Sequence, residues 1–138
     1  MFVDAGKNEK NIFKPEFTII NTGSVALKNY KIRGYISAPN GNSFNVPVDD
    51  WYTPESTPSL TKVADNIWML EITFNEHILY SGQDVFSGNI GIHLEDWNEF
   101  DKSLLGLVVV DENGEILWGT PWDGSRIIHN QEYANVQK

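Results

Sequence analysis

Residues 29 to 37 read NYKIRGYIS, and this stretch decides the fold class. Ile32 and Ile36 fall on one face of an extended chain, whereas Lys31 and Arg33 fall on the other. Alternation of apolar and polar side chains with a period of two residues is typical of a β-strand with one buried face. The stretch therefore predicts a strand of a sheet that packs on one side.

Further segments rich in β-branched and aromatic residues lie on both sides of this strand, separated by Gly, Pro and Asn. The expected strands are 15–23, 29–37, 43–48, 67–74, 83–93, 104–111 and 115–119. Phe44, Val46 and Val48 are expected to share one face, and Asn113-Gly114 is typical of a hairpin turn. Since no long segment keeps the period of a helix, the sequence predicts an all-β fold, an antiparallel β-sandwich with jelly-roll topology.

The length and composition of the chain predict one globular domain over residues 1–138, with a core of about 12–128 and a polar C-terminal tail. The formal net charge of -9 argues against nucleic acid and anionic lipid as partners. No apolar run is long enough for a membrane helix. The first residues lack the pattern of a signal peptide, so an export signal is expected outside this sequence.

Motifs of catalysis are missing from the sequence. It holds no GxSxG, Walker loop, GxGxxG, HExxH or cysteine. Its many carboxylates are expected to form a solvated acidic surface, although a pair of them facing each other across a cleft would be needed for a glycosidase. We therefore expect no enzyme activity, no catalytic residue, no metal site and no cofactor.

Tryptophans in polar loops are the strongest functional signal. Trp51 in VDDWYTP, Trp97 in LEDWNEF and Trp122 in GTPWDG fall outside the alternating apolar faces. Sugar rings stack their C–H groups on aromatic faces while their hydroxyls bond to nearby Asp and Asn side chains, so such residues suit a carbohydrate surface. Trp51 and Trp97 are expected to be exposed, although a ring that folds back as a loop plug is the alternative for Trp97.

The remaining tryptophans have a simpler explanation. Trp68 in IWMLEI and Trp118 in ILWG lie within expected strands, where packing in the core or on a sheet face is the expected role. For Trp122, a lid over one edge of the sandwich and a ligand contact remain equally open.

Several segments, taken in order, resemble the carbohydrate-binding modules of family 3, the cellulose-binding domains of bacterial cellulases and cellulosome scaffolds. They cover most of residues 12–119. The segments are PEFTIINTGSVALKNYKIRGYI (15–36), LEITFNEHILYSGQDVFSG (70–88), DWNEF (96–100) and NGEILWG (113–119).

The resemblance implies a jelly-roll sandwich that binds cellulose through a strip of residues on one sheet. Trp97 corresponds to the strip tryptophan, and Asp50-Trp51 looks like the family's Asp-aromatic pair, with Tyr52 as a neighbour that assists. Hydrogen bonds to the sugar are expected from Asp50. The other expected hydrogen-bonding residues are Asn89, His93 and Asn98.

The sequence also departs from the family pattern. Asn89 stands where the strip arginine is expected, or that position has moved into a loop that gained residues around His93. The ion pair that flattens the family's strip would then be missing. Leu104 and Leu105 stand where an Asn-Asp pair usually helps to hold calcium, and neither can coordinate it. A divergent member of the family is implied.

The sequence thus predicts a non-catalytic module, secreted within a larger plant-cell-wall-degrading enzyme or scaffold, with covalently linked catalytic or scaffold domains. Its expected ligand is cellulose or another β-glucan. The alternative is a protein-interaction module that packs on an adjacent catalytic domain, with the same aromatics at the interface. The polar neighbours of each ring favour a sugar, because the core of a protein interface is depleted of charged residues.

Overall fold

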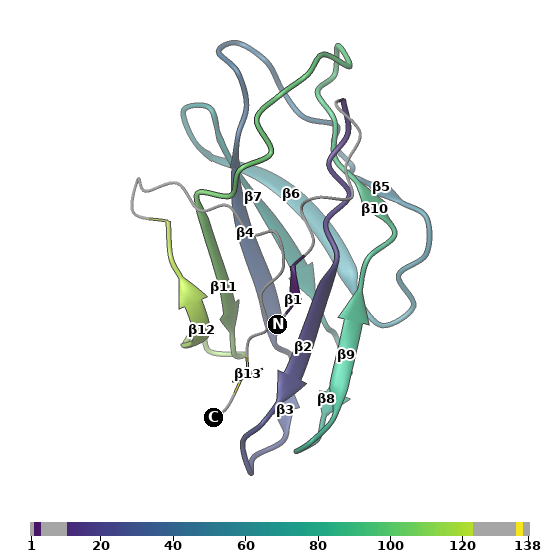
Figure 1. The fold of residues 1–138 in the computed structure, drawn as a ribbon, viewed down its shortest axis with the longest axis vertical. Coiled ribbons are helices and arrows are strands. Elements are labelled where there is room, and N and C mark those ends of the chain that lie inside the picture. The colour runs from purple at the N-terminus through teal and green to yellow at the C-terminus, as the bar shows by residue number, and fades with distance from the viewer. Residues whose placement is uncertain (1, 4–10, 123–134, 137–138) are drawn as a thin grey trace.

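The computed structural model describes residues 2–3, 11–122 and 135–136. Within these residues the regular elements are strands, arranged in two layers (Figure 1). The described part of the chain contains no helix of the length and apolar character that a membrane crossing requires. The polar tail expected after residue 128 lies almost wholly outside the described residues.

The back layer is a five-stranded antiparallel sheet with the order β12-β11-β4-β7-β6. Lys31–Ser37 forms β4, whose burial alternates as its sequence predicts, and the neighbouring strands pair with it in register. The bounds of the other strands are β6 Thr57–Ala64, β7 Ile67–Thr73, β11 Gly106–Val110 and β12 Ile116–Thr120.

The front layer is built around β2, which pairs with β1 and β9 in antiparallel fashion and with β13 in parallel. The chain of β9 continues into β10, which pairs with β5, and single bridges join Phe13 to Ile92 and Phe44 to Leu94. Residues 84–94 therefore follow one path along this layer, paired first with β2 and then with β5. Its strands are β1 Phe2–Val3, β2 Phe17–Asn21, β5 Asp49–Asp50, β9 Asp84–Ser87, β10 Ile90–Gly91 and β13 Asn135–Val136.

A short ribbon of β3 (Leu27–Lys28) and β8 (Ile78–Leu79) closes the lower end of the molecule in Figure 1. Between the layers lies one apolar core to which both contribute. Trp68 of β7 is buried and packs edge-on against Phe44, and Trp118 is partly buried against the same core. The packing role expected for these two tryptophans is confirmed.

One expected strand is absent, and one observed strand was not expected. The segment 43–48 is not a strand, because the chain bends at Val46-Pro47; Phe44 and Val48 are buried, whereas Val46 is 62% exposed. Proline lacks the N–H that a ladder needs, which explains the interruption. The strand β6 was not expected, because Leu60 is its one buried residue and its other side chains are mostly polar. An edge strand of this kind gives a weak pattern.

The predicted hairpin is confirmed. β11 and β12 pair in antiparallel fashion, and Gly114 adopts a φ of 82° in the turn between them. The Asp111 carboxylate accepts hydrogen bonds from the N–H groups of Asn113 and Glu115, at 2.8 and 2.9 Å, and so closes the turn. The structure shows the all-β sandwich that the alternation in 29–37 predicts.

Candidate functional site

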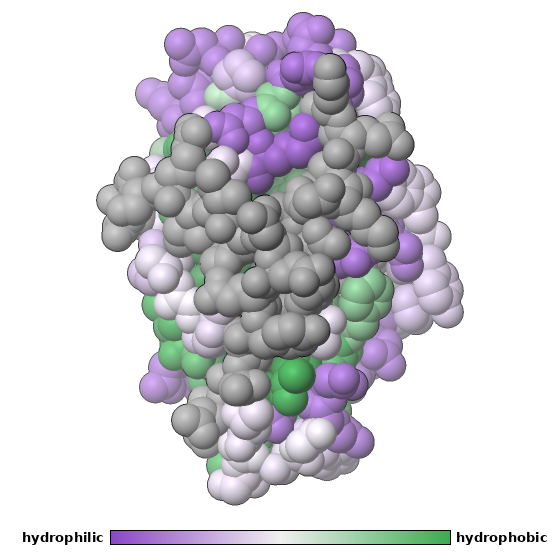
Figure 2. Space-filling model, viewed as in Figure 1, coloured by the Kyte–Doolittle hydropathy of each residue, from purple (hydrophilic) through white to green (hydrophobic). Residues whose placement is uncertain are grey.

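Exposed aromatic rings gather along the outer face of the front layer. Figure 2 views that side, with hydrophilic surface at the upper end, near the loop 94–103, and apolar patches further down. The expected exposure of Trp51 and Trp97 is confirmed, since these side chains are 56% and 52% exposed. Tyr52 and Phe86 are 68% and 54% exposed.

Trp51 lies across the backbone of Gly91. A Cβ atom built on Gly91 would stand 2.6 Å from Cη2 of the indole and 2.9 Å from Cδ1 of Ile12, so only glycine leaves room for the ring. Lys14 Nζ lies 5.7 Å from the centre of the Trp51 ring, within the range of a cation–π contact. The indole therefore packs against the sheet at Gly91 while more than half of the residue faces solvent.

Trp97 is displayed by a strained turn. Its φ of 61° is unusual for a large side chain. The turn is held by the Trp97 N–H, which donates to Leu94 O at 3.0 Å, and by Asn11 Nδ2, which donates to Trp97 O. A backbone outlier that presents an exposed ring is a reason to suspect a functional role.

His93 forms a seat for Trp97. The two rings are stacked, with centroids 3.5 Å apart and planes 10° apart. The His93 Nδ1 atom lies 2.7 Å from Leu94 O, and its Nε2 atom lies 3.6 Å from an Asp49 carboxylate oxygen. These two contacts, one on each ring nitrogen, fix the orientation of the imidazole. Trp97 thus has one face on the protein and the other toward solvent, and it is not buried as a plug.

His93 itself is buried, with 9% of the residue exposed. Its backbone N–H donates to Asn45 Oδ1 at 2.9 Å. The sequence departs from the family pattern around Asn89 and His93, where the ion pair of the strip arginine is expected to be missing. In this region the structure has a contact between His93 and Asp49. His93 therefore supports the Trp97 ring and has little exposed surface that could contact a sugar hydroxyl.

Asp50 and Asn98 take part in local turns. The Thr53 hydroxyl donates to the Asp50 carboxylate, at 2.9 and 2.8 Å from its two oxygens. The Asn98 N–H and Nδ2 donate to the Asp96 carboxylate at 3.0 and 3.1 Å. All four side chains are at the surface, so these carboxylates shape the loops that carry Trp51 and Trp97 and keep accepting positions open to solvent.

Asn89 connects the strand to the aromatic loop. It adopts a φ of 60°, which asparagine tolerates better than most residues. Its carbonyl accepts the Trp51 N–H at 2.9 Å, and its Nδ2 donates to Tyr52 O at 3.4 Å. Asn89 therefore fixes the backbone from which both rings project.

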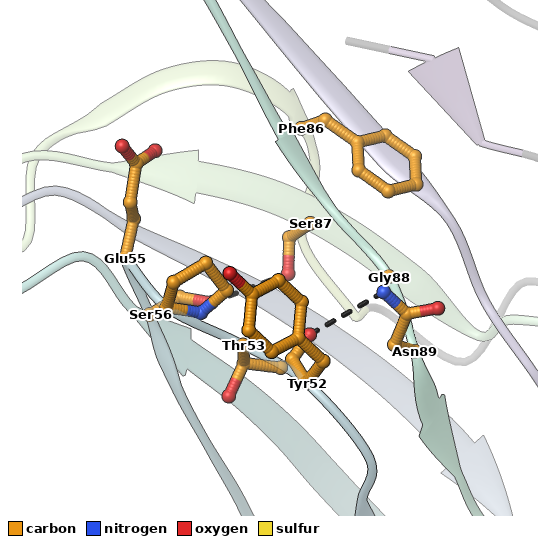
Figure 3. A pocket seen from close by; sticks show the side chains of 9 residues that line it. Tyr52, Thr53, Glu55, Ser56, Phe86, Ser87, Gly88 and Asn89 are labelled. Atoms are coloured by element: carbon orange, nitrogen blue, oxygen red, sulfur yellow. Dashed lines mark hydrogen bonds between the residues drawn. The ribbon is translucent and has the colours of Figure 1, made fainter.

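Two hollows flank Asn89 on this face. One has a cavity volume of about 320 Å³ and is lined by Lys14, Glu16, Trp51, Asn89 and Ile90. The other is smaller, about 140 Å³, and lies between residues 52–56 and residues 86–89 (Figure 3).

Phe86 is the aromatic residue that the sequence did not single out. It lies on β9, where Val85 and Ser87 point inward, so Phe86 points outward. Its ring covers Gly88, at which an added Cβ would stand 2.7 Å from Phe86 Cζ. The signal that could have found it is the alternation itself, since a phenylalanine on the polar face of a strand needs an explanation.

Trp122 lies elsewhere. It stacks on Tyr35 of the back layer, with centroids 6.0 Å apart, and its backbone N would stand 2.5 Å from a Cβ added to Gly106. This close packing over the sheet favours the lid, although the ring is 37% exposed. Among the described residues, no cluster of three or more His, Cys, Asp or Glu side chains is placed to hold a metal ion.

No protein-family model matches the chain, and no curated protein matches it significantly. Solved structures do match. The carbohydrate-binding module CBM3b of the cellulosomal cellobiohydrolase 9A from Clostridium thermocellum has a TM-score of 0.65 at 22% identity, covering 87% of this chain and 96% of that one. A family 3 module of Hungateiclostridium clariflavum has a TM-score of 0.66 at 20% identity, covering 86% of this chain and 96% of that one.

A third match is the family 3a carbohydrate-binding module of the cipA scaffolding of Clostridium thermocellum, with a TM-score of 0.57 at 18% identity, covering 86% of this chain and 97% of that one. Likeness at this level of identity concerns the fold. The expectation drawn from the sequence segments is confirmed to that extent: the chain has the β-sandwich fold of the family 3 carbohydrate-binding modules, with a divergent sequence.

Proposed function

We propose that this protein is a non-catalytic carbohydrate-binding module that attaches a larger secreted plant-cell-wall-degrading enzyme or scaffold to cellulose or a related β-glucan. The observation that carries the proposal is the row of exposed rings on one side of the front layer. Trp97 on His93, Trp51 on Gly91 and Phe86 on Gly88 follow one another along residues 86–93. We call this set the aromatic row.

The length of the aromatic row suits a polymer. Positions 86 and 93 are seven residues apart, and a fully extended chain rises about 3.3 Å for each residue, so the row spans at most on the order of 20 Å. An extended polysaccharide could meet several rings at once. Each stacked ring contributes about 1 to 3 kcal/mol by analogy with aromatic platforms for other planar ligands, and linked contacts reinforce one another.

The charge of the site supports a neutral ligand. The loops that carry Trp51 and Trp97 hold Asp50, Asp96 and Glu95, and the chain has a formal net charge of -9. A β-glucan carries no charge and is not repelled, whereas an acidic polysaccharide would be. The side chains of Asp50 and Asn98 lie beside the rings and can bond to sugar hydroxyls.

Attachment to other domains is supported by the kind of protein that shares the fold. One matched module belongs to a cellulosomal cellobiohydrolase and others to the scaffolding of a cellulosome. By this analogy the module is exported with its parent protein. The rival, a protein-interaction module, would place the same rings against an adjacent domain, and binding assays separate the two.

The experiment is a depletion isotherm on microcrystalline cellulose beside affinity electrophoresis in a soluble β-glucan. Wild type is compared with Trp97→Ala and Trp51→Ala, and with Tyr80→Ala as a control. Tyr80 is 55% exposed but lies in the turn after β8, at the lower end of the molecule, away from the row. Each tryptophan variant should lose about tenfold or more in affinity while remaining folded.

The control should bind as wild type does. The better of the two ligands distinguishes a crystalline surface from separate chains. If wild type binds neither, the proposal is wrong, and the rings are to be tested as an interface with the neighbouring domain.

A further inference from the structure

The smaller hollow beside the aromatic row has the features of a separate subsite. It lies between the loop 52–56 and the end of β9, and Figure 3 shows the Tyr52 and Phe86 rings on either side of Ser87. We call it the Tyr52–Phe86 cleft. Its two rings are exposed, but Ser87 between them is only 4% exposed, so the floor is recessed below the aromatic edges.

We propose that the Tyr52–Phe86 cleft binds one sugar residue of a single β-glucan chain, and that it distinguishes separate chains from the surface of a crystal. This inference rests on the proposed function. It assigns a role to Tyr52 and to the cleft floor, and it gives Phe86, a ring of the aromatic row, a second contact with the sugar.

The size of the cleft suits one sugar ring. Its volume of about 140 Å³ is well below the roughly 300 Å³ at which pockets for drug-sized ligands begin. A longer stretch of polymer must therefore continue outside it. The larger hollow, lined in part by Trp51, adjoins the cleft at Asn89, so a chain that leaves the cleft can continue along the aromatic row.

The chemistry of the lining suits a pyranose. The rings of Tyr52 and Phe86 offer apolar area for C–H groups. On the floor, the hydroxyls of Ser56 and Ser87 lie 3.4 Å apart, and each can donate or accept. Glu55 at the rim is a further acceptor, with 53% of its side chain exposed.

The loop that forms one wall is fixed at both ends. Thr53 donates to Asp50, and Glu55 Oε2 lies 3.4 Å from His77 Nε2. His77 Nδ1 in turn lies 2.6 Å from the hydroxyl of the buried Tyr30. A loop held in this way presents a preformed wall, which lowers the entropy cost of binding.

The recessed floor selects for a separate chain. A sugar that reaches Ser87 has protein on two sides, so it cannot also have neighbouring chains packed beside it. A chain within a crystal face is flanked by its neighbours and can touch only the exposed edges of rings. The cleft should therefore contribute to binding of soluble chains and contribute little on a crystalline surface.

Gly88 allows a test that keeps the phenylalanine. An added Cβ would stand 2.7 Å from Cζ and 3.0 Å from Cε1 of the Phe86 ring, and the φ of Gly88 is not in the left-handed region. Gly88→Ala should fold, because the far end of a side chain is what must move. The ring should be displaced from its present position beside the cleft.

The experiment titrates the full chain with cellohexaose by calorimetry and measures depletion on microcrystalline cellulose in parallel. The variants are Phe86→Ala, Gly88→Ala and Tyr52→Ala, with Trp97→Ala as the reference for the row and Tyr80→Ala as the control. Phe86→Ala and Tyr52→Ala should weaken binding of cellohexaose by about tenfold, and Gly88→Ala by several-fold. On microcrystalline cellulose Tyr52→Ala should stay within about twofold of wild type, whereas Phe86→Ala and Gly88→Ala, which remove or displace a ring of the aromatic row, should lose affinity there too.

The outcomes separate this inference from the proposed function. If Trp97→Ala loses binding while Phe86→Ala and Tyr52→Ala bind cellohexaose as wild type does, the module binds glucan and the cleft is not a subsite. If Tyr52→Ala loses affinity equally on both ligands, its ring belongs to the general binding surface and the selectivity for single chains is wrong. If wild type binds neither ligand, both proposals fail together.

Discussion

The outer faces of the two layers use their side chains in opposite ways. On the back layer, Glu71 accepts a hydrogen bond from Arg33 at 2.8 Å and lies 3.7 Å from Lys31. The charged side chains of neighbouring strands therefore pair with one another. On the front layer, Trp51 and Phe86 lie over glycines and keep more than half of their surface in solvent.

Under the proposed function, this difference leaves one face of the sandwich available for a ligand. Charged side chains that pair across strands have their partners within the chain, so they leave few polar groups for a ligand. Exposed rings on glycine seats leave apolar area uncovered, and exposed apolar area of that kind marks interaction sites.

The glycine seat of Trp51 should be essential for binding. Gly91→Ala places a methyl group 2.6 Å from the ring and should displace it, lowering affinity for β-glucan by about tenfold, as loss of the ring would. Gly34→Ala is the matched control, because its added Cβ would meet Leu104 and Leu107 at an ordinary 3.7 Å. Affinity electrophoresis of both variants checks the prediction; equal affinities would show that the seat does not matter.

Tyr30 connects the core to the loop 52–56 through His77 and Glu55, and it should make the fold sensitive to alkali. Burial, and secondly the negative charge of Glu55, raise the pKa of the Tyr30 hydroxyl well above its usual value. Above about pH 10 the unfolded chain loses this proton while the folded chain keeps it. The folded state then binds more protons, so the free energy of unfolding falls as pH rises, by up to about 1.4 kcal/mol for each pH unit.

Urea denaturation at about pH 9 and about pH 11 measures this loss of stability. Tyr30→Phe should show a smaller decline than wild type, whereas the exposed control Tyr80→Phe should decline as wild type does. A decline in Tyr30→Phe as steep as that of wild type would remove Tyr30 as its cause.

The turn that displays the Trp97 ring should carry backbone strain. Glycine adopts a φ of 61° without the cost that other residues meet, so Trp97→Gly should be more stable than Trp97→Ala by about 1 kcal/mol. Both variants should lose binding to the same extent, because both lack the indole. Thermal unfolding and a depletion isotherm test the two halves of this prediction, and an alanine variant as stable as the glycine variant would argue against strain.

On the back layer the expected effect concerns stability alone. Glu71→Ala removes the partner of Arg33 and Lys31 and should lower the free energy of unfolding by about 0.5 to 1 kcal/mol. Its affinity for β-glucan should stay within about twofold of wild type, since the ion pairs lie on the other face. A large loss of binding in this variant would break the contrast between the faces.

Sequence reasoning predicted the sandwich because alternation is a local property. In 29–37 and 67–74 the inward and outward residues can be read directly, and β4 and β7 follow that pattern. It failed where the pattern is weak or interrupted. β6 buries little besides Leu60, and the bend at Val46-Pro47 ends a run that looks regular on paper.

For the site, sequence reasoning predicted which loops display tryptophans but not what holds them. The exposure of Trp51 and Trp97 follows from their polar neighbours. The supports come from elsewhere in the chain: Gly91 lies under Trp51, and Asn11 holds the turn of Trp97. Contacts between residues distant in sequence leave no local pattern, and Phe86 was overlooked because it lies in a strand.

The most direct test of the central claim uses the indole N–H signals of the five tryptophans in a ¹⁵N-labelled protein titrated with cellohexaose. The account predicts that the signals of Trp51 and Trp97 shift as ligand is added. Those of Trp68, in the core, of Trp118, packed against the core, and of Trp122, on the back layer, should stay in place. Shifts of Trp122 without shifts of Trp51 and Trp97, or no shift at a saturating concentration, would contradict the assignment of the front face as the β-glucan surface.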